Sequence, residues 1–151
     1  MGAVDHDWVA SATEILQASG RRAGGARSEV IAALAKETCA VSAEQIEHAV
    51  QRSGKRVGRA SIYRALEALD QVGLVQRVDL GEGGARWERV GADPHHHHHH
   101  LLCRKCCEVV PFEDEGLELE LHRLGDRSGF TIETHDVTLH GLCSKCAKLK
   151  R

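Results

Sequence analysis

Two pairs of cysteines with matched spacing are the residues best suited to do chemistry. Cys103 and Cys106 form one Cys-x-x-Cys pair, and Cys143 and Cys146 form the other. Two such pairs can present four thiolates tetrahedrally to one Zn²⁺, and four soft thiolates select zinc or an iron–sulfur centre over hard cations. A site closed by four protein ligands has no position for a substrate, so a structural metal is favoured. The alternatives are incidental pairs or a redox dithiol.

Six consecutive histidines at 95–100 are a second set of potential ligands. The run is internal and leads into the first cysteine pair, which argues against a purification tag. In a strand, its odd- and even-numbered members would face opposite sides, so one strand can supply two metal sites. Candidate partners elsewhere are Glu88, Glu118 and His135. Imidazoles and carboxylates suit Zn²⁺, Fe²⁺, Mn²⁺, Ni²⁺ or Co²⁺ without choosing among them.

Cations gather in one stretch, although the net charge is only −2. No acid interrupts 52–64, which contains Arg52, Lys55, Arg56, Arg59 and Arg64. A local basic stripe, rather than overall charge, is the footprint of a nucleic-acid binder. The alternative is a solvated helix face.

The face of the helix predicted over 59–72 carries Ala60, Tyr63 and Arg64. In a DNA complex these residues would enter the major groove, where Arg can read guanine and Ala60 can contact a thymine methyl. A second group would contact phosphates or the minor groove and set position rather than sequence preference. Its members are Arg22, Arg27, Arg56 and Arg59. The alternative for Tyr63 is ordinary packing.

Helices followed by a hairpin are expected to position these residues. Helices are predicted over 5–18, 28–37, 42–51 and 59–72, and strands over 74–80 and 85–90. Ser42 and Gln45 form a capping box, and Gly73 ends the last helix. On that helix the core residues follow helical spacing: Ile62, Ala65, Leu66 and Leu69. Three helices and a two-stranded wing make a winged helix.

A turn-forming segment at 91–94 resembles a hinge before a small α/β unit. Strands are predicted over 101–112 and 130–142, with a helix over 115–125 between them. Leu117, Leu121 and Leu124 are expected to face inward from that helix, and His135 from the last strand. A lone inward histidine is otherwise a core residue. A unit of this size often needs a metal or a partner for stability.

Composition limits the compartment and the class of protein. The apolar runs are too short for a transmembrane span or a signal peptide, so we expect a cytoplasmic protein with no membrane partner. Six cysteines in a reducing compartment are not expected to form disulfides. A metalloenzyme is disfavoured because there is no HExxH motif or nucleophile arrangement. A metal-storage or chaperone protein using the histidine run remains the alternative.

The chain resembles the ferric uptake regulator family. Three segments carry the resemblance: VGRASIYRALEALDQVGLV, HHHHHHLLCRKC and THDVTLHGLCSKC. The resemblance implies an α+β fold, with a winged-helix DNA-binding domain over 1–91 and a metal-binding dimerisation domain over 92–151. It also implies a homodimeric repressor, not an enzyme, that binds operator DNA when a regulatory metal is loaded and controls metal-homeostasis or stress genes.

The resemblance also implies three metal sites. The structural zinc falls on Cys103, Cys106, Cys143 and Cys146. The dimerisation-domain site falls on His97, His99, Glu118 and His135. The regulatory hinge site falls on Glu88, His98 and His100. The regulatory metal is expected to be Zn²⁺ or Fe²⁺, with Mn²⁺ and Ni²⁺ as alternatives.

The sequence departs from the family at the hinge site. Ala40 stands where the family often has His, and Pro111 where it often has an acidic residue, so two usual ligands are missing. The first basic segment has GGAR where the family usually has a Thr-Pro turn. Candidate replacements for the hinge ligands are Cys39, Asp79, Asp93, His95 and His96.

Overall fold

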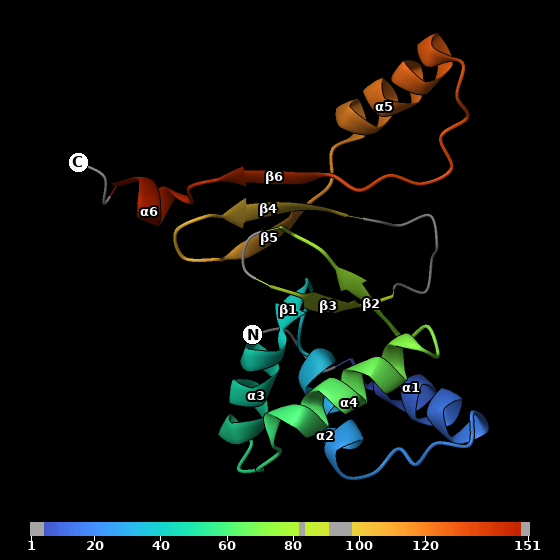
Figure 1. Cartoon of the computed structure of the whole chain (residues 1–151), viewed down its shortest axis with the longest axis vertical. Coiled ribbons are helices and arrows are strands. Elements are labelled where there is room, and N and C mark those ends of the chain that lie inside the picture. Colours follow the sequence, from blue (N-terminus) through green and yellow to red (C-terminus); the bar gives the residue numbers. More distant parts are fainter. Residues whose placement is uncertain (1–4, 82–83, 91–97, 149–151) are drawn as a thin grey trace. The chain divides into compact units, whose positions relative to one another are not determined.

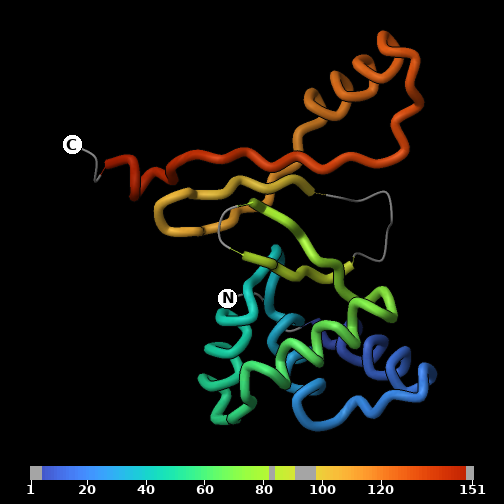
Figure 2. Tube along the Cα trace, viewed as in Figure 1, coloured from blue at the N-terminus to red at the C-terminus, as the bar shows by residue number. Residues whose placement is uncertain are grey.

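The computed structural model describes residues 5–81, 84–90 and 98–148 of the chain. Chain contacts divide it into two compact units, Met1–Ala92 and Asp93–Arg151. Figures 1 and 2 follow the chain through both units. The first holds four helices and a three-stranded sheet, and the second a three-stranded sheet with two helices. The predicted α+β class is confirmed. None of the helices in the described residues has the length and apolar character that a membrane crossing requires.

Unit 1 is built on helices that begin where capping residues stand. Its elements are α1 (His6–Ala18), α2 (Ala26–Leu34), β1 (Val41–Ser42), α3 (Ala43–Arg52), α4 (Arg59–Asp70), β2 (Val75–Val78) and β3 (Arg86–Arg89). The Asp5 carboxylate accepts from the Trp8 N–H and caps α1. The predicted capping box is confirmed: the Gln45 N–H donates to Ser42 Oγ, and the Ser42 N–H donates to Gln45 Oε1.

The core of unit 1 lies where its four helices meet the sheet. The predicted inner face of α4 is confirmed, since Ile62, Ala65, Leu66 and Leu69 are all buried. They pack with Leu16, Ile31, Leu34, Ile46 and Val75 in one cluster. The opposite face of α4 remains exposed, and this leaves it available to a partner.

The wing has one strand more than the sequence predicted. The strand order is β1-β3-β2, and β1 pairs through Val41 with Trp87 and through Ser42 with Arg86. In the antiparallel β2–β3 pair, Gln76 lies opposite Glu88. A two-residue strand shows no periodicity, which is why β1 was not predicted.

Unit 2 contains a sheet of order β5-β4-β6. Along the chain, a long helix lies between β5 and β6. Its elements are β4 (His99–Cys103), β5 (Val109–Phe112), α5 (Glu115–Ser128), β6 (Thr138–Gly141) and α6 (Ser144–Lys148). Strand β4 pairs antiparallel with β5 and parallel with β6. Asp114 caps α5 by accepting from the Leu117 N–H at 2.7 Å, and Gly129 ends the helix in the left-handed conformation.

Three predictions for unit 2 are wrong. The strand expected over 101–112 is divided into β4, which ends at Cys103, and β5, which begins at Val109. The strand expected over 130–142 exists only over Thr138–Gly141, and the chain before it is irregular (Figure 2). Leu124 was expected to face inward but is 52% exposed. Helix α5 extends beyond the edge of its sheet (Figure 1).

Gly125 is the point where α5 and the returning segment come closest. A Cβ there would lie 2.7 Å from Ile132 Cγ1 and 2.9 Å from the Phe130 carbonyl oxygen. We expect Gly125→Ala to lower the free energy of unfolding by about 1–3 kcal/mol, because the backbone oxygen cannot yield without moving the loop. Urea unfolding followed by circular dichroism measures this. Ser128→Ala, at an exposed position of the same helix, is the control, and an equal effect in both variants would contradict the explanation.

Candidate metal centres and nucleic-acid interface

The four paired cysteines converge at one end of the unit 2 sheet. Cys103 ends β4, Cys106 lies in the following turn, and Cys143 and Cys146 lie at the start of α6 and within it. Their four sulfurs lie within 4.8 Å of one another, and the Cys106 and Cys143 sulfurs are 3.7 Å apart. Tetrahedral Zn–S bonds of about 2.3 Å require sulfurs about 3.8 Å apart. The four-cysteine site therefore suits a structural zinc ion.

The local backbone makes these thiols unequal. Backbone N–H groups of Cys143 and Cys106 lower the pKa of the Cys103 thiol to about 6, and the Cys143 N–H lies 3.3 Å from its sulfur. Burial raises the pKa of the Cys146 thiol to about 12. The Cys103 thiol therefore ionises more readily than the Cys146 thiol. Cys107 lies outside the cluster, with an exposed side chain and a backbone φ of 59°.

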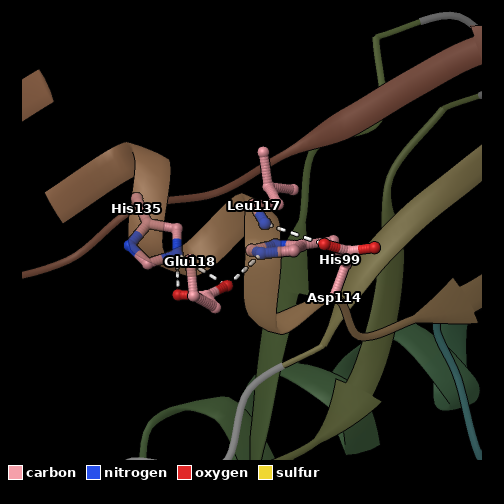
Figure 3. Close-up of polar contacts among 5 residues, drawn as sticks. All are labelled: His99, Asp114, Leu117, Glu118 and His135. Atoms are coloured by element: carbon pink, nitrogen blue, oxygen red, sulfur yellow. Dashed lines mark hydrogen bonds and ion pairs between the residues drawn. The ribbon is translucent and has the colours of Figure 1, made fainter. Parts of the chain in front are cut away.

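A second cluster lies at the other end of β4. Glu118 stands between His99 and His135 (Figure 3), 2.6 Å from His99 Nε2 and 3.0 Å from His135 Nε2. His99 is 2% exposed and packs against the ring of Phe112. The three ligand atoms lie within 4.8 Å of one another. Two imidazoles and a carboxylate at this spacing fit a divalent metal of the zinc, iron or manganese kind.

The route by which His135 reaches this cluster differs from the prediction. It was expected on a strand face shared with Val137 and Leu139, but it lies in the irregular segment before β6. It still reaches Glu118 because the cap at Asp114 fixes where α5 begins, which sets Glu118 in its first turn. His97, the fourth predicted member, lies outside the described residues.

The residues proposed as hinge ligands come from both units. In unit 1, Glu88 is buried, and Gln76 Nε2 donates to its carboxylate at 2.7 Å. Cys39 precedes β1, and its sulfur lies within 4.8 Å of a Glu88 carboxylate oxygen. In unit 2, the rings of His98 and His100 lie 5.0 Å apart. The sequence had named Cys39 only as one of several replacements, and Asp93, His95 and His96 lie outside the described residues.

The exposed face of α4 carries the residues predicted to read DNA. Tyr63 is 41% exposed, and its ring meets Trp87 of β3 edge to face at a centroid distance of 5.6 Å. Arg64 donates to Ser61 Oγ at 2.9 Å, one turn earlier on the same helix. Ala60 is exposed beside them. Tyr63 therefore both packs against the sheet and presents its outer edge to solvent.

The arginines predicted to contact phosphates differ in their present partners. Arg27 donates to the Arg22 carbonyl oxygen. Arg56 and Lys55 line an open hollow in the turn between α3 and α4. Arg59 is bound to Glu47 of α3, a residue that the sequence did not single out. Gln76 was also missed, since a partner that is distant in sequence leaves no local signal.

The fold and these sites define a metal-dependent DNA-binding regulator. Residues 18–140 match the ferric uptake regulator family model. The ferric uptake regulation protein of Neisseria gonorrhoeae is 33% identical over 138 residues, which cover 90% of this chain and 94% of that protein. The Vibrio cholerae ferric uptake regulator has a similar structure, with a TM-score of 0.74 and 28% identity over 87% of this chain and 98% of that one. The Helicobacter pylori regulator reaches a TM-score of 0.81 at 21% identity, covering 97% of each chain.

The chain belongs to the ferric uptake regulator family. Membership makes it a transcriptional regulator and not an enzyme, as the sequence predicted. The four-cysteine cluster and the His99–Glu118–His135 cluster are groups whose ligand atoms lie close enough together to hold a metal ion.

Proposed function

We propose that the chain is a homodimeric, cytoplasmic repressor that binds operator DNA when a regulatory metal is loaded. Its winged-helix domain would span residues 1–91 and its dimerisation domain 92–151. The observation that carries this proposal is the exposed Tyr63–Arg64 face of α4 in a chain that also forms a His99–Glu118–His135 cluster. The exposed helix face suits a DNA partner, and the histidine–glutamate cluster suits a metal ion.

The DNA interface assigns base contacts to α4. Ala60, Tyr63 and Arg64 would enter the major groove, since they are exposed on the face opposite the buried core residues. The Ser61 hydroxyl supports this by holding the Arg64 guanidinium along the helix. Phosphate contacts would come from Arg22, Arg27, Arg56 and Arg59.

The metal sites divide into one structural and two regulatory centres. Zinc at the four cysteines would hold unit 2 together. In the dimerisation domain, His97 would join His99, Glu118 and His135. The clustering of the last three supports the assignment.

The hinge site would use Glu88, His98 and His100, with Cys39 as a further ligand in place of the family's usual histidine. The proximity of Cys39 to Glu88 in unit 1 supports this, as does the pairing of the His98 and His100 rings in unit 2. A metal shared by these residues fixes the angle between the two domains. Within unit 1, Gln76 would hold the Glu88 carboxylate in position for the metal by donating a hydrogen bond to it. A thiolate ligand favours Zn²⁺ over Mn²⁺ as the regulatory metal, with Fe²⁺ next.

A second copy of the chain is the proposed partner of unit 2. Its exposed apolar residues are Leu101, Val110, Leu119, Leu124, Phe130, Leu139 and Leu142. Two copies related by a two-fold axis could cover these side chains mutually, and a unit this small gains stability from such burial.

Metal analysis paired with DNA binding tests the whole proposal. Purified protein would be analysed for metal content before and after mild chelation, and the same samples would be titrated with duplex DNA selected from a random pool. We expect a tightly held zinc in each chain and a chelatable metal that switches DNA binding on. DNA binding that is independent of the chelatable metal would contradict the sensor role.

A further inference from the structure

We propose that Glu47 masks Arg59 at the start of the recognition helix, so that a DNA phosphate must displace the Glu47 carboxylate before Arg59 can contribute. This inference rests on the proposed DNA-binding function and adds to it an internal competitor for one phosphate contact. Arg59 Nε and Nη2 both approach Glu47 Oε2, at 2.9 and 2.8 Å. The guanidinium therefore uses two of its donors on one carboxylate oxygen.

Position explains why the pair forms. Arg59 is the first residue of α4, where the helix dipole disfavours a cation. Gly58, the N-cap, provides no side-chain cap that could offset this. Two acids on α3, Glu47 and Glu44, supply the missing negative charge, and hydrogen bonding to Glu47 raises the pKa of Arg59.

Exposure explains why the pair can open. The Arg59 side chain is 58% exposed and the Glu47 side chain 17%. The Arg59 guanidinium can thus turn outward on its flexible side chain, whereas the Glu47 carboxylate, which is less exposed, is less free to move. Arg59 is adjacent to Ala60 on the exposed part of α4, so turning outward carries it toward a bound duplex.

The exchange predicts a distinct salt dependence. In the wild-type protein, transferring Arg59 from Glu47 to a phosphate gains one ion pair and loses another, so little net affinity results. Without the carboxylate, each Arg59 adds a full phosphate contact, and the slope of log affinity against log salt becomes steeper by about 0.9 for each contact.

The test compares four metal-loaded proteins: wild type, Glu47→Gln, Arg59→Gln and the double variant. The probe is a fluorescein-labelled mixed-sequence duplex of roughly 30 base pairs, titrated by anisotropy from about 50 to 300 mM KCl. Glu47→Gln is expected to bind the duplex roughly three- to twenty-fold more tightly than the wild type, depending on whether one or both Arg59 side chains of the proposed dimer contact a phosphate. Its slope of log affinity against log salt should also be steeper. The double variant should return to near the wild-type affinity and slope.

The controls separate this inference from the DNA-binding proposal. Glu14→Gln makes the same change in net charge on α1 and should shift affinity far less than Glu47→Gln. Thermal unfolding of each variant verifies the fold. If the wild type binds DNA and Glu47→Gln binds no more tightly, the masking role is wrong and Glu47 only orients α3 against α4. If the wild type itself binds no duplex, the DNA-binding proposal fails, and the masking role with it.

Discussion

Replacing Cys143 with serine is expected to release the structural zinc and to unfold unit 2 while leaving unit 1 folded. Cys143 contributes twice to the four-cysteine site. Its sulfur lies 3.7 Å from that of Cys106, and its backbone N–H donates to the Cys103 sulfur. Structural zinc contributes roughly 10–16 kcal/mol to folding in peptide models. Loss of the zinc ion would therefore remove more free energy than the net stability of a domain, about 5–15 kcal/mol, can offset in so small a unit.

The distribution of buried residues explains why the two units should respond differently. The hydrophobic core cluster of the described residues lies wholly within unit 1. In unit 2 the buried side chains are mostly proposed ligands: His99, His100, Cys103 and Cys146, with Leu102 among them. Unit 2 is therefore expected to depend on metal for the stability that unit 1 obtains from packed leucine, isoleucine and valine side chains.

Elemental analysis, circular dichroism and size-exclusion chromatography measure the outcome for Cys143→Ser. Cys107→Ser is a matched control, because Cys107 is next to Cys106 in the sequence but lies outside the four-cysteine cluster. The control should retain zinc and its oligomeric state. Full zinc occupancy in Cys143→Ser would show that three thiolates suffice, and would contradict the structural role given to the fourth.

The double variant Glu88→Ala with His98→Ala is expected to lose metal-dependent DNA binding without losing its fold. The two residues belong to different units, and the proposed hinge metal would connect them. Couplings between ligand sites are typically 5- to 150-fold, so the metal-loaded variant should bind DNA weaker than the wild type by about that factor. Metal-free affinity should hardly change, because neither residue belongs to the DNA interface.

Anisotropy titrations with and without the regulatory metal provide the comparison. The control is Glu14→Ala with His122→Ala, which removes one acid and one histidine from the two units, outside every proposed ligand set. By linkage, DNA must also tighten metal binding in the wild type by the same factor that metal tightens DNA binding. A double variant that keeps the full metal response would refute the hinge site.

Local signals in the sequence predicted the helices and the ligand pairs well. The capping box at Ser42 and Gln45 and the helical spacing of Ile62 to Leu69 are both present in the structure. The matched spacing of the cysteines also sufficed to predict their cluster. Each of these patterns lies within a few residues, where chain geometry determines which side chains can meet.

Features that depend on distant neighbours were not predicted. The pairing of β1 with β3 involves two residues about 45 positions apart in sequence, which no local period reveals. His135 reaches Glu118 from an irregular segment, so strand alternation was the wrong basis for expecting it inward. Glu47 and Gln76 are ordinary polar residues whose importance is evident only once Arg59 and Glu88 are placed against them.

Strand β4 carries adjacent histidines, His99 and His100, that belong to two different proposed ligand sets. The ring of His99 meets Phe112 and His135, whereas the ring of His100 meets that of His98. Consecutive Cα atoms are about 3.8 Å apart, and one peptide plane joins them rigidly. A metal that displaced either imidazole would therefore also tilt the peptide plane that joins it to the other histidine. If both proposed centres bind metal, a single peptide bond between His99 and His100 would couple them directly, without a chain of packed core residues between them.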